Sequence, residues 1–179
     1  MSTPRVVSVS RDETHGFSKH PVAAIELVAG IGVIGDAHAG TLVQHRYDVR
    51  KDPNRRNLRQ VHLIQSEVFD EVRERGHEVG AGDLGENVTT AGIDLLALPA
   101  GTRLDLGGPV VRLTGLRQPC VLINRFQAGL MKVLIEKVDG ETIRKAGVMS
   151  VVERGGEVRP GAPITVSLPG EPHHPMVPV

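Results

Sequence analysis

The sequence has few aromatic side chains, with no Trp, one Tyr and three Phe among 179 residues. Proteins that bind single-stranded nucleic acid stack its bases on aromatic rings, so this class is disfavoured. Lys and Arg together number 21, as do Asp and Glu, and this balance gives no chain-wide attraction to nucleic acid or to an anionic membrane. We therefore expect aliphatic side chains to form the core and any charged site to be local.

Cysteine and long apolar segments are also scarce. The single cysteine, Cys120, cannot form an intramolecular disulfide, and the N-terminus has no apolar stretch of the signal-peptide type. No apolar run approaches the roughly 20 residues that a transmembrane helix needs. These features predict a cytoplasmic protein without a membrane partner, and the length predicts one domain.

Short aliphatic runs alternate with Gly, Pro and Asp, a pattern typical of β-strands joined by tight turns. The expected strands are residues 5–10, 23–29, 61–65, 102–106, 110–114, 148–153 and 163–168. This many short strands predicts a mainly β domain, a barrel or a sandwich, over residues 1–168. Residues 169–179 contain four prolines and no periodicity, so we expect a disordered tail or a surface strap.

Two segments carry helical signals. Residues 66–75 have suitable capping residues at both ends, and Glu71 and Arg75 are spaced as an i,i+4 ion pair. Apolar residues recur at helical spacing through residues 120–134, although Gly129 weakens the interior of this run. The sequence therefore predicts a few short helices, with a break near Gly129.

The motif Arg117-Gln118-Pro119-Cys120 joins a predicted strand to the second helical run. Pro119 suits the first helical position, which would place Cys120 in the first turn. Free backbone N–H groups there, and the charge of Arg117, would favour the nucleophilic and metal-binding thiolate. The alternative is a buried cysteine that acts as a small hydrophobic side chain.

A glycine-rich segment, residues 30–40, contains Asp36 and His38 two positions apart. In an extended segment the two side chains would project on the same side. They could then orient a substrate, relay a proton or contribute to a metal site. The alternative is a turn in which Asp36 hydrogen-bonds its own backbone.

Further candidates lie in polar segments. Residues 44–60 contain six basic and two acidic side chains, and this loop, which includes Arg59, is either solvated or a lid over an anionic ligand. Glu86 and Asn87 directly follow a glycine, and could belong to a site or to a capped turn that leads into a strand. No His or Cys spacing supports a zinc site, so a metal bound only by protein ligands is disfavoured.

Several short motifs, including those above, follow one another along the chain. They are Gly35-Asp36-Ala37-His38-Ala39-Gly40, Arg59-Gln60-Val61-His62-Leu63-Ile64, Gly85-Glu86-Asn87-Val88-Thr89, Leu98-Pro99-Ala100-Gly101-Thr102, Arg117-Gln118-Pro119-Cys120, Gly147-Val148-Met149 and Gly155-Gly156-Glu157-Val158-Arg159-Pro160-Gly161. Taken in this order they resemble the MOSC domain family, which includes the C-terminal domain of molybdenum cofactor sulfurases. The resemblance covers roughly residues 6–168.

The resemblance implies a compact β-barrel with a few short helices. It also implies that Cys120 faces a pocket for a molybdenum–pterin cofactor or for the sulfur destined for it. We expect Cys120 to be a metal ligand and catalytic residue, and we infer that His38 and Asp36 are further catalytic residues. The residues expected to bind the cofactor are Arg117, Glu86, Asn87, Arg59 and His62.

Three functions follow as expectations. In the first, the domain reduces N-hydroxylated small molecules with electrons from a separate donor protein. In the second, Cys120 carries persulfide sulfur received from a cysteine desulfurase, for metal–sulfur cluster or cofactor sulfuration. The third is a non-catalytic module that binds an anionic metabolite.

Overall fold

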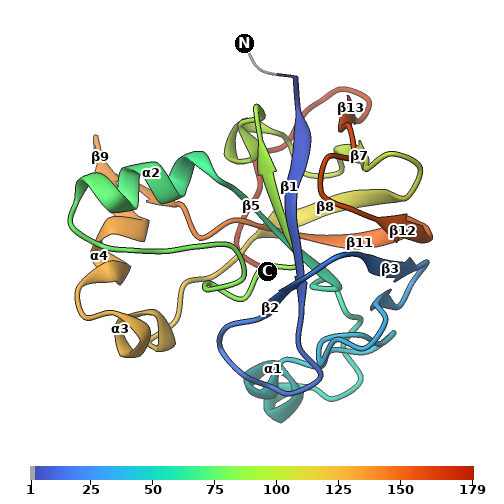
Figure 1. Cartoon of the computed structure of the whole chain (residues 1–179), viewed down its shortest axis with the longest axis horizontal. Coiled ribbons are helices and arrows are strands. Elements are labelled where there is room, and N and C mark those ends of the chain that lie inside the picture. Colours follow the sequence, from blue (N-terminus) through green and yellow to red (C-terminus); the bar gives the residue numbers. More distant parts are fainter. Residues whose placement is uncertain (1–2) are drawn as a thin grey trace.

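The computed structural model describes residues 3–179 and consists mainly of short strands (Figure 1). Eight strands form one sheet in the order β13-β7-β8-β11-β5-β6-β1-β2. Their bounds are β1 Arg5–Arg11, β2 His20–Val22, β5 Val61–Gln65, β6 Val88–Ala91, β7 Arg103–Asp105, β8 Val110–Leu116, β11 Val148–Arg154 and β13 Thr165–Ser167. Neighbouring strands are antiparallel except β5 and β6, which are parallel.

Smaller elements surround this sheet. A three-stranded sheet contains β3 Ile25–Val28, β4 Gly32–Val33 and β12 Gly156–Val158, and a hairpin contains β9 Ile135–Val138 and β10 Glu141–Arg144. The helices are α1 Arg46–Lys51, α2 Glu67–Glu74, η1 Leu95–Ala97, α3 Leu122–Phe126 and α4 Leu130–Leu134. Helices α2, α3 and α4 gather on one side of the molecule, and α1 lies apart from them (Figure 1). Within residues 3–179, no helix has the length and apolar character needed to cross a membrane.

The predicted mainly β class is confirmed, whereas the closed barrel stays a prediction. Strand pairing over the described residues leaves β13 and β2 at the two ends of the large sheet. One isolated bridge, between Arg5 and Pro163, joins β1 to the segment just before β13. The sheet therefore curls toward closure without a continuous ring of paired strands.

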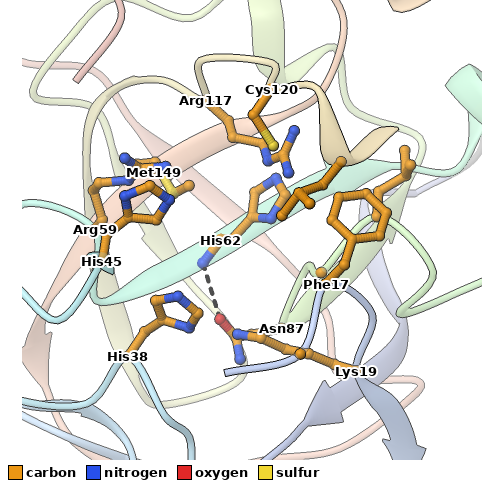
Figure 2. Close-up of a pocket in the computed structure, with 14 residues that line it drawn as sticks. Phe17, Lys19, His38, His45, Arg59, His62, Asn87, Arg117, Cys120 and Met149 are labelled. Atoms are coloured by element: carbon orange, nitrogen blue, oxygen red, sulfur yellow. Dashed lines mark hydrogen bonds between the residues drawn. The ribbon is translucent and has the colours of Figure 1, made fainter. Parts of the chain in front are cut away.

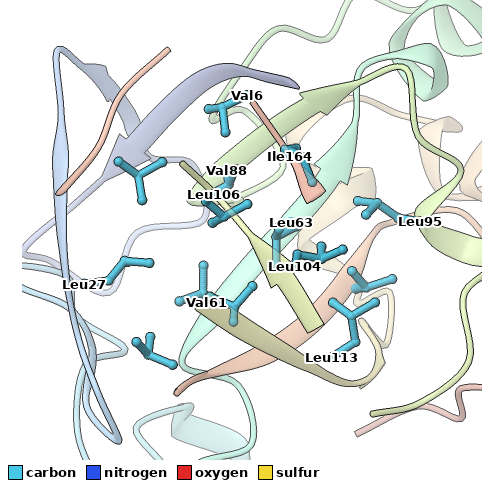
Figure 3. Close-up of a cluster of buried hydrophobic side chains, with 14 of the residues drawn as sticks. Val6, Leu27, Val61, Leu63, Val88, Leu95, Leu104, Leu106, Leu113 and Ile164 are labelled. Carbon is cyan, nitrogen blue, oxygen red and sulfur yellow. The ribbon is translucent and has the colours of Figure 1, made fainter. Parts of the chain in front are cut away.

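Strand β5 separates two hydrophobic clusters. Val61 and Leu63 are fully buried in the larger cluster, which Figure 3 shows packed between the sheet strands. Ile64 belongs instead to a second cluster with α2, α3 and α4. Because side chains alternate along a strand, His62 lies on the same side as Ile64, opposite the larger cluster. This alternation places one face of β5 beside the helices, where the candidate site is found.

The two helical predictions fare differently in detail. Helix α2 matches residues 66–75 closely, but Glu71 pairs with Lys145 and Arg75 with Glu136, so the predicted i,i+4 pair is wrong. Long side chains at a helix surface take the better-placed partners that the tertiary fold brings near them. The predicted break is confirmed, because Gly129 has a φ of 86° and separates α3 from α4.

The C-terminal segment lies along β8 as a strap. The backbone N–H of Ala100 donates to His174 O at 2.9 Å, and that of Leu116 donates to Val177 O at 2.9 Å. Met176 is buried in the larger hydrophobic cluster. The strap alternative therefore describes these residues, while the domain division at residue 168 stays a prediction. Residues 1 and 2 of the predicted domain lie outside the described range.

Candidate functional site

Cys120 lies in the loop between β8 and α3, and it is partly exposed. Helix α3 begins only at Leu122, so the predicted place of Cys120 in the first helical turn is wrong. Val121 occupies the N-cap position, and the Cys120 carbonyl accepts the first turn-forming hydrogen bond, from Ile123 N at 3.0 Å. A five-residue helix adds little dipole at this distance, because that effect falls off within one turn. The positive charge near the sulfur comes instead from arginine side chains.

Two cavities meet at Cys120. Cys120 lines both the smaller one, of about 90 Å³, here called the inner cavity, and the larger one, of about 600 Å³, called the outer cavity. Four residues line both cavities: His45, Arg59, Arg117 and Cys120. Figure 2 shows the inner cavity, with Arg117 and Cys120 on one side and His38, Asn87 and Lys19 on the opposite side. Cys120 is thus reached from a small chamber and from a large one.

Asp36 is buried behind the inner cavity and does not line it. It accepts hydrogen bonds from Lys19 Nζ at 3.1 Å, from Asn87 Nδ2 at 3.0 Å and from the backbone N–H of His38 at 3.0 Å. Gly35, with a φ of 74°, turns the chain just before it. The extended segment predicted for Asp36 and His38 is therefore wrong, and the turn alternative is what forms.

Charge compensation keeps Asp36 ionised. Burial acts to raise its pKa, but hydrogen bonds from His38 and the ion pair with Lys19 outweigh burial and hold the pKa well below its usual value. Burial lowers the pKa of Lys19, and the charge of Asp36 partly offsets that effect. Lys19 forms the floor of the inner cavity and Asp36 holds it from behind, with side chains that are only 5% and 0% exposed.

His38 extends from this floor into the inner cavity. Its Nδ1 lies 3.4 Å from Asp36 Oδ1, and the ring of His45 stacks against it with centroids 6.3 Å apart. Burial lowers the pKa of His38, with Asp36 acting in the opposite direction. Because its pKa is lowered, the ring is neutral near pH 7. In a neutral imidazole one nitrogen donates a hydrogen bond and the other accepts one.

His45 and Arg59 belong to the loop of residues 44–60, here called the basic loop, and both line the inner cavity. Asp48 of α1 lies 3.1 Å from Arg59 Nη1, 4.0 Å from Arg55 Nη1 and 3.5 Å from His45 Nδ1. Burial, followed by the charge of Arg59, lowers the pKa of His45 to about 4. One carboxylate thus serves two arginines, which leaves this wall of the outer cavity with surplus positive charge.

His62 and Asn87 complete the wall formed by the sheet. His62 Nε2 lies 2.7 Å from Ala146 O, and because a carbonyl can only accept, this nitrogen carries the proton. Asn87 Oδ1 accepts from the backbone N–H of His62 at 3.1 Å, as Figure 2 marks. Burial and the charge of Arg117 hold the pKa of His62 well below its usual value, so the ring is neutral.

Glu86 does not line either cavity. Its side chain is fully buried, where Oε1 accepts from Gly82 N at 2.6 Å and from Thr89 Oγ1 at 3.1 Å. Burial raises its pKa. The residue supports the loop that carries Asn87, and the structure gives it no direct access to a ligand.

Arg117 is buried between the two cavities, only 8% exposed. Its guanidinium carbon lies 5.9 Å from the centre of the Phe17 ring, and it neighbours Cys120. Nη1 has no hydrogen-bond partner among residues 3–179. Burial lowers the pKa of Arg117, and the neighbouring Cys120 opposes this shift.

The fold brings together six of the eight site residues that the sequence predicted. Six predicted site residues line the inner cavity: Cys120, His38, Arg59, His62, Asn87 and Arg117. Lys19 and Phe17 were missed, because each is an isolated residue in a loop whose position depends on tertiary contacts. Across residues 3–179, no three His, Cys, Asp or Glu side chains are arranged to hold a metal ion.

The sequence matches the model of the MOSC domain over residues 41–165. The chain belongs to the MOSC domain family. The matched region contains the cysteine loop, β5 and β6, whereas the Asp36–His38 turn lies just before it. A comparison with curated proteins finds no match.

Solved structures share the fold of this MOSC domain. The YuaD protein from Bacillus subtilis is 21% identical, with a TM-score of 0.77 over 94% of this chain and 98% of that one. YiiM from Geobacillus stearothermophilus is 20% identical, with a TM-score of 0.66 over 96% of this chain and 79% of that one. YiiM from Escherichia coli is 17% identical, with a TM-score of 0.61 over 95% and 73% of the two chains. At these identities the likeness establishes the fold alone.

Proposed function

We propose that this MOSC domain binds a molybdenum–pterin cofactor through the sulfur of Cys120 and reduces N-hydroxylated small molecules. The observation that carries the proposal is the position of Cys120 at the junction of a large and a small cavity. A cofactor in the outer cavity and a substrate in the inner one would then meet at a single sulfur.

The outer cavity suits such a cofactor in size and charge. A volume of about 600 Å³ falls in the range of sites for organic ligands, which is roughly 300–1,000 Å³. Arg55 and Arg59 share only Asp48, so positive charge remains to bind a phosphate group. The Cys120 thiolate is a soft ligand of the kind that molybdenum accepts.

The bound cofactor would supply the two-electron redox chemistry. Reduction of an N–OH group to N–H also consumes two protons and releases water, and the electrons must come from a separate donor protein. His38, fixed by the Asp36 turn at the edge of the inner cavity, is the group placed to relay a proton from solvent to the substrate there. Asn87 and His62 would orient the substrate.

Molybdenum analysis tests the proposal. Wild-type protein made in a host that synthesises the cofactor should carry molybdenum, and Cys120→Ser should lose about tenfold or more. His38→Asn should retain the metal but lose reduction of a hydroxylamine substrate, which separates cofactor binding from proton transfer. Wild-type protein that cannot be loaded with the cofactor would contradict the proposal.

A second function is that Cys120 carries a persulfide. The observation in its favour is that the only thiol of the chain is partly exposed at the large outer cavity, where the persulfide of a cysteine desulfurase could approach. Incubation with a desulfurase and cysteine should then add the mass of one sulfur atom to wild type but not to Cys120→Ser. An unchanged intact mass would argue against this function.

A further inference from the structure

The inner cavity has an uneven set of polar groups. Its charged side chains are Lys19, Arg59 and Arg117, and among the described residues no carboxylate lines it. Lys19 is neutralised from behind by Asp36, and Arg59 by Asp48. Arg117 forms no salt bridge with a carboxylate among the described residues, and only Cys120 and the buried Glu86 favour its charge from nearby.

A buried guanidinium group without a salt bridge destabilises the folded protein. Removing a charge from water carries a large penalty unless an opposite charge or hydrogen bonds replace the lost hydration. Arg117 is 8% exposed, its Nη1 lacks a partner among residues 3–179, and the Phe17 ring beside it offers only a cation–π contact. Such an arrangement persists in an evolved site when a ligand supplies the missing negative charge.

The guanidinium group of Arg117, which lines both cavities, lies beside residues of the inner one. Phe17 and His62, which both lie close enough to interact with the Arg117 charge, line only the inner cavity. Figure 2 shows the guanidinium beside the His62 ring, on the same side of the cavity as the Cys120 sulfur. An anion bound to Arg117 from this side would lie next to Cys120.

The size of the cavity restricts the ligand. The inner cavity is much smaller than the outer one, at about 90 Å³ against about 600 Å³. A planar oxyanion of about three or four non-hydrogen atoms fits this space, and its two oxygens match the fork of a guanidinium group. A phosphate ester is larger and suits the outer cavity, where Arg55 and Arg59 lie.

We propose that the inner cavity binds a small planar oxyanion, either an inorganic ion or the carboxylate of a larger molecule, which Arg117 holds beside Cys120. This inference rests on the proposed function in one respect: the bound anion is taken to be the substrate itself or an acidic group of the substrate. The binding itself requires neither molybdenum nor turnover. The substrate class is thereby narrowed to anions.

Anion binding can be measured on the metal-free protein by following alkylation of Cys120, its only thiol, with iodoacetamide. Sodium nitrate serves as the planar probe and replaces sodium chloride at constant ionic strength. Nitrate should slow alkylation of wild type in a saturable manner, by about tenfold at saturation. Arg117→Met should abolish this protection, and Arg117→Lys should weaken it.

Arg55→Met is the matched control, because Arg55 lines the outer cavity and not the inner one. It should leave nitrate protection unchanged. Methyl phosphate, a probe for the cofactor's phosphate, should act through Arg55 and Arg59 instead. If nitrate protects Arg117→Met as well as wild type, or loses its effect in Arg55→Met, the inner cavity is not the anion site and the inference is wrong.

Thermal unfolding gives a second measurement. If Arg117 had only a structural role, its replacement would lower the midpoint of unfolding, whereas an anion-binding role predicts a higher midpoint. Without an anion, Arg117→Met removes a buried charge that has no salt bridge and should raise the midpoint of unfolding by about 5 °C. Nitrate should raise the midpoint of wild type but not that of the variant. A lowered midpoint in Arg117→Met, or a wild-type protein indifferent to nitrate, would overturn the inference. Because the protein is metal-free, this failure is distinct from a failure to bind molybdenum.

Discussion

Lys19 and Asp36 show how individual residues build the floor of the site. Both side chains are almost fully buried, and Asp36 also fixes Asn87 and the backbone of His38. The sequence indicated Asp36 and His38 through their spacing between glycines, but Lys19 has no such signal. An ion pair across a loop depends on where the chain folds back, which local patterns do not encode.

Replacing Lys19 by Met should destabilise the protein, because the charge of Asp36 would remain buried with only uncharged donors. We expect a loss of about 3 kcal/mol in the free energy of unfolding, measured by urea denaturation near neutral pH. Lys137→Met, at an exposed strand position, should change it by no more than about 0.5 kcal/mol. Equal effects of the two substitutions would show that the buried pair is not a stabilising feature.

His45 should make stability depend on pH. Its pKa is lowered from 6.5 to about 4 in the folded protein, so between these values the unfolded chain binds a proton that the folded protein does not. The free energy of unfolding should therefore fall as the pH falls from about 6.5 to about 4. His38 acts in the same direction, because its pKa is also lowered.

The measurement is urea denaturation of wild type and His45→Gln at about pH 7 and about pH 5. The variant should lose less stability than wild type over this interval. His174→Gln, which removes an exposed imidazole, should follow wild type. A pH dependence that is the same in all three proteins would exclude His45 as a source.

At the scale of elements, strands with clear alternation were the most predictable. β5 coincides with the predicted residues 61–65, and in β7 Leu104 is buried while Arg103 is exposed. β6 was expected only as the strand that a capped turn would lead into, because all four of its residues are buried and two are threonines, which removes the alternating pattern. The β9–β10 hairpin was missed because helical spacing continues up to Leu134, and the sequence does not mark where the helix gives way to a strand.

The strap depends on close approach to β8 at Gly115. A Cβ atom there would overlap Val177 O and lie 2.6 Å from Val179 Cγ1. Gly115→Ala should therefore displace the strap, which also contributes Pro178 and Val179 to the outer cavity, at a cost of about 1–3 kcal/mol. Urea denaturation should detect the loss, and carboxypeptidase should trim the C-terminus faster.

Gly170→Ala provides the control within the strap segment, because nothing lies within 4 Å of the added methyl group. It should unfold and be trimmed like wild type. If Gly115→Ala also behaves like wild type, the strap is not held by close contact with β8.

At the scale of the molecule, the site lies where β5 divides the two hydrophobic clusters. The larger cluster holds the sheet on one face, the smaller one holds the helices on the other, and Arg117 and Cys120 lie in the loop between β8 and α3. Packing in the core fixes the position of β5, and β5 in turn places His62 at the inner cavity. Family resemblance supplied the grouping of the motifs, but not the two cavities, whose shapes depend on packing.

Leu63→Ala should test how strongly this frame depends on its centre. Leu63 is fully buried in the larger cluster, and the truncation should lower the free energy of unfolding by about 3 kcal/mol. Leu168→Ala, at a side chain that is 55% exposed, should have little effect. Similar values for both variants in urea denaturation would contradict the assignment of Leu63 to the core.

The central claim is that the Cys120 sulfur is a ligand of a bound molybdenum. Its most direct test is X-ray absorption at the molybdenum edge, comparing wild type with Cys120→Ser after both are loaded with the cofactor in vitro. The account predicts one sulfur ligand fewer in Cys120→Ser, with the remaining ligands unchanged. An identical number of sulfur ligands in the two proteins would contradict it.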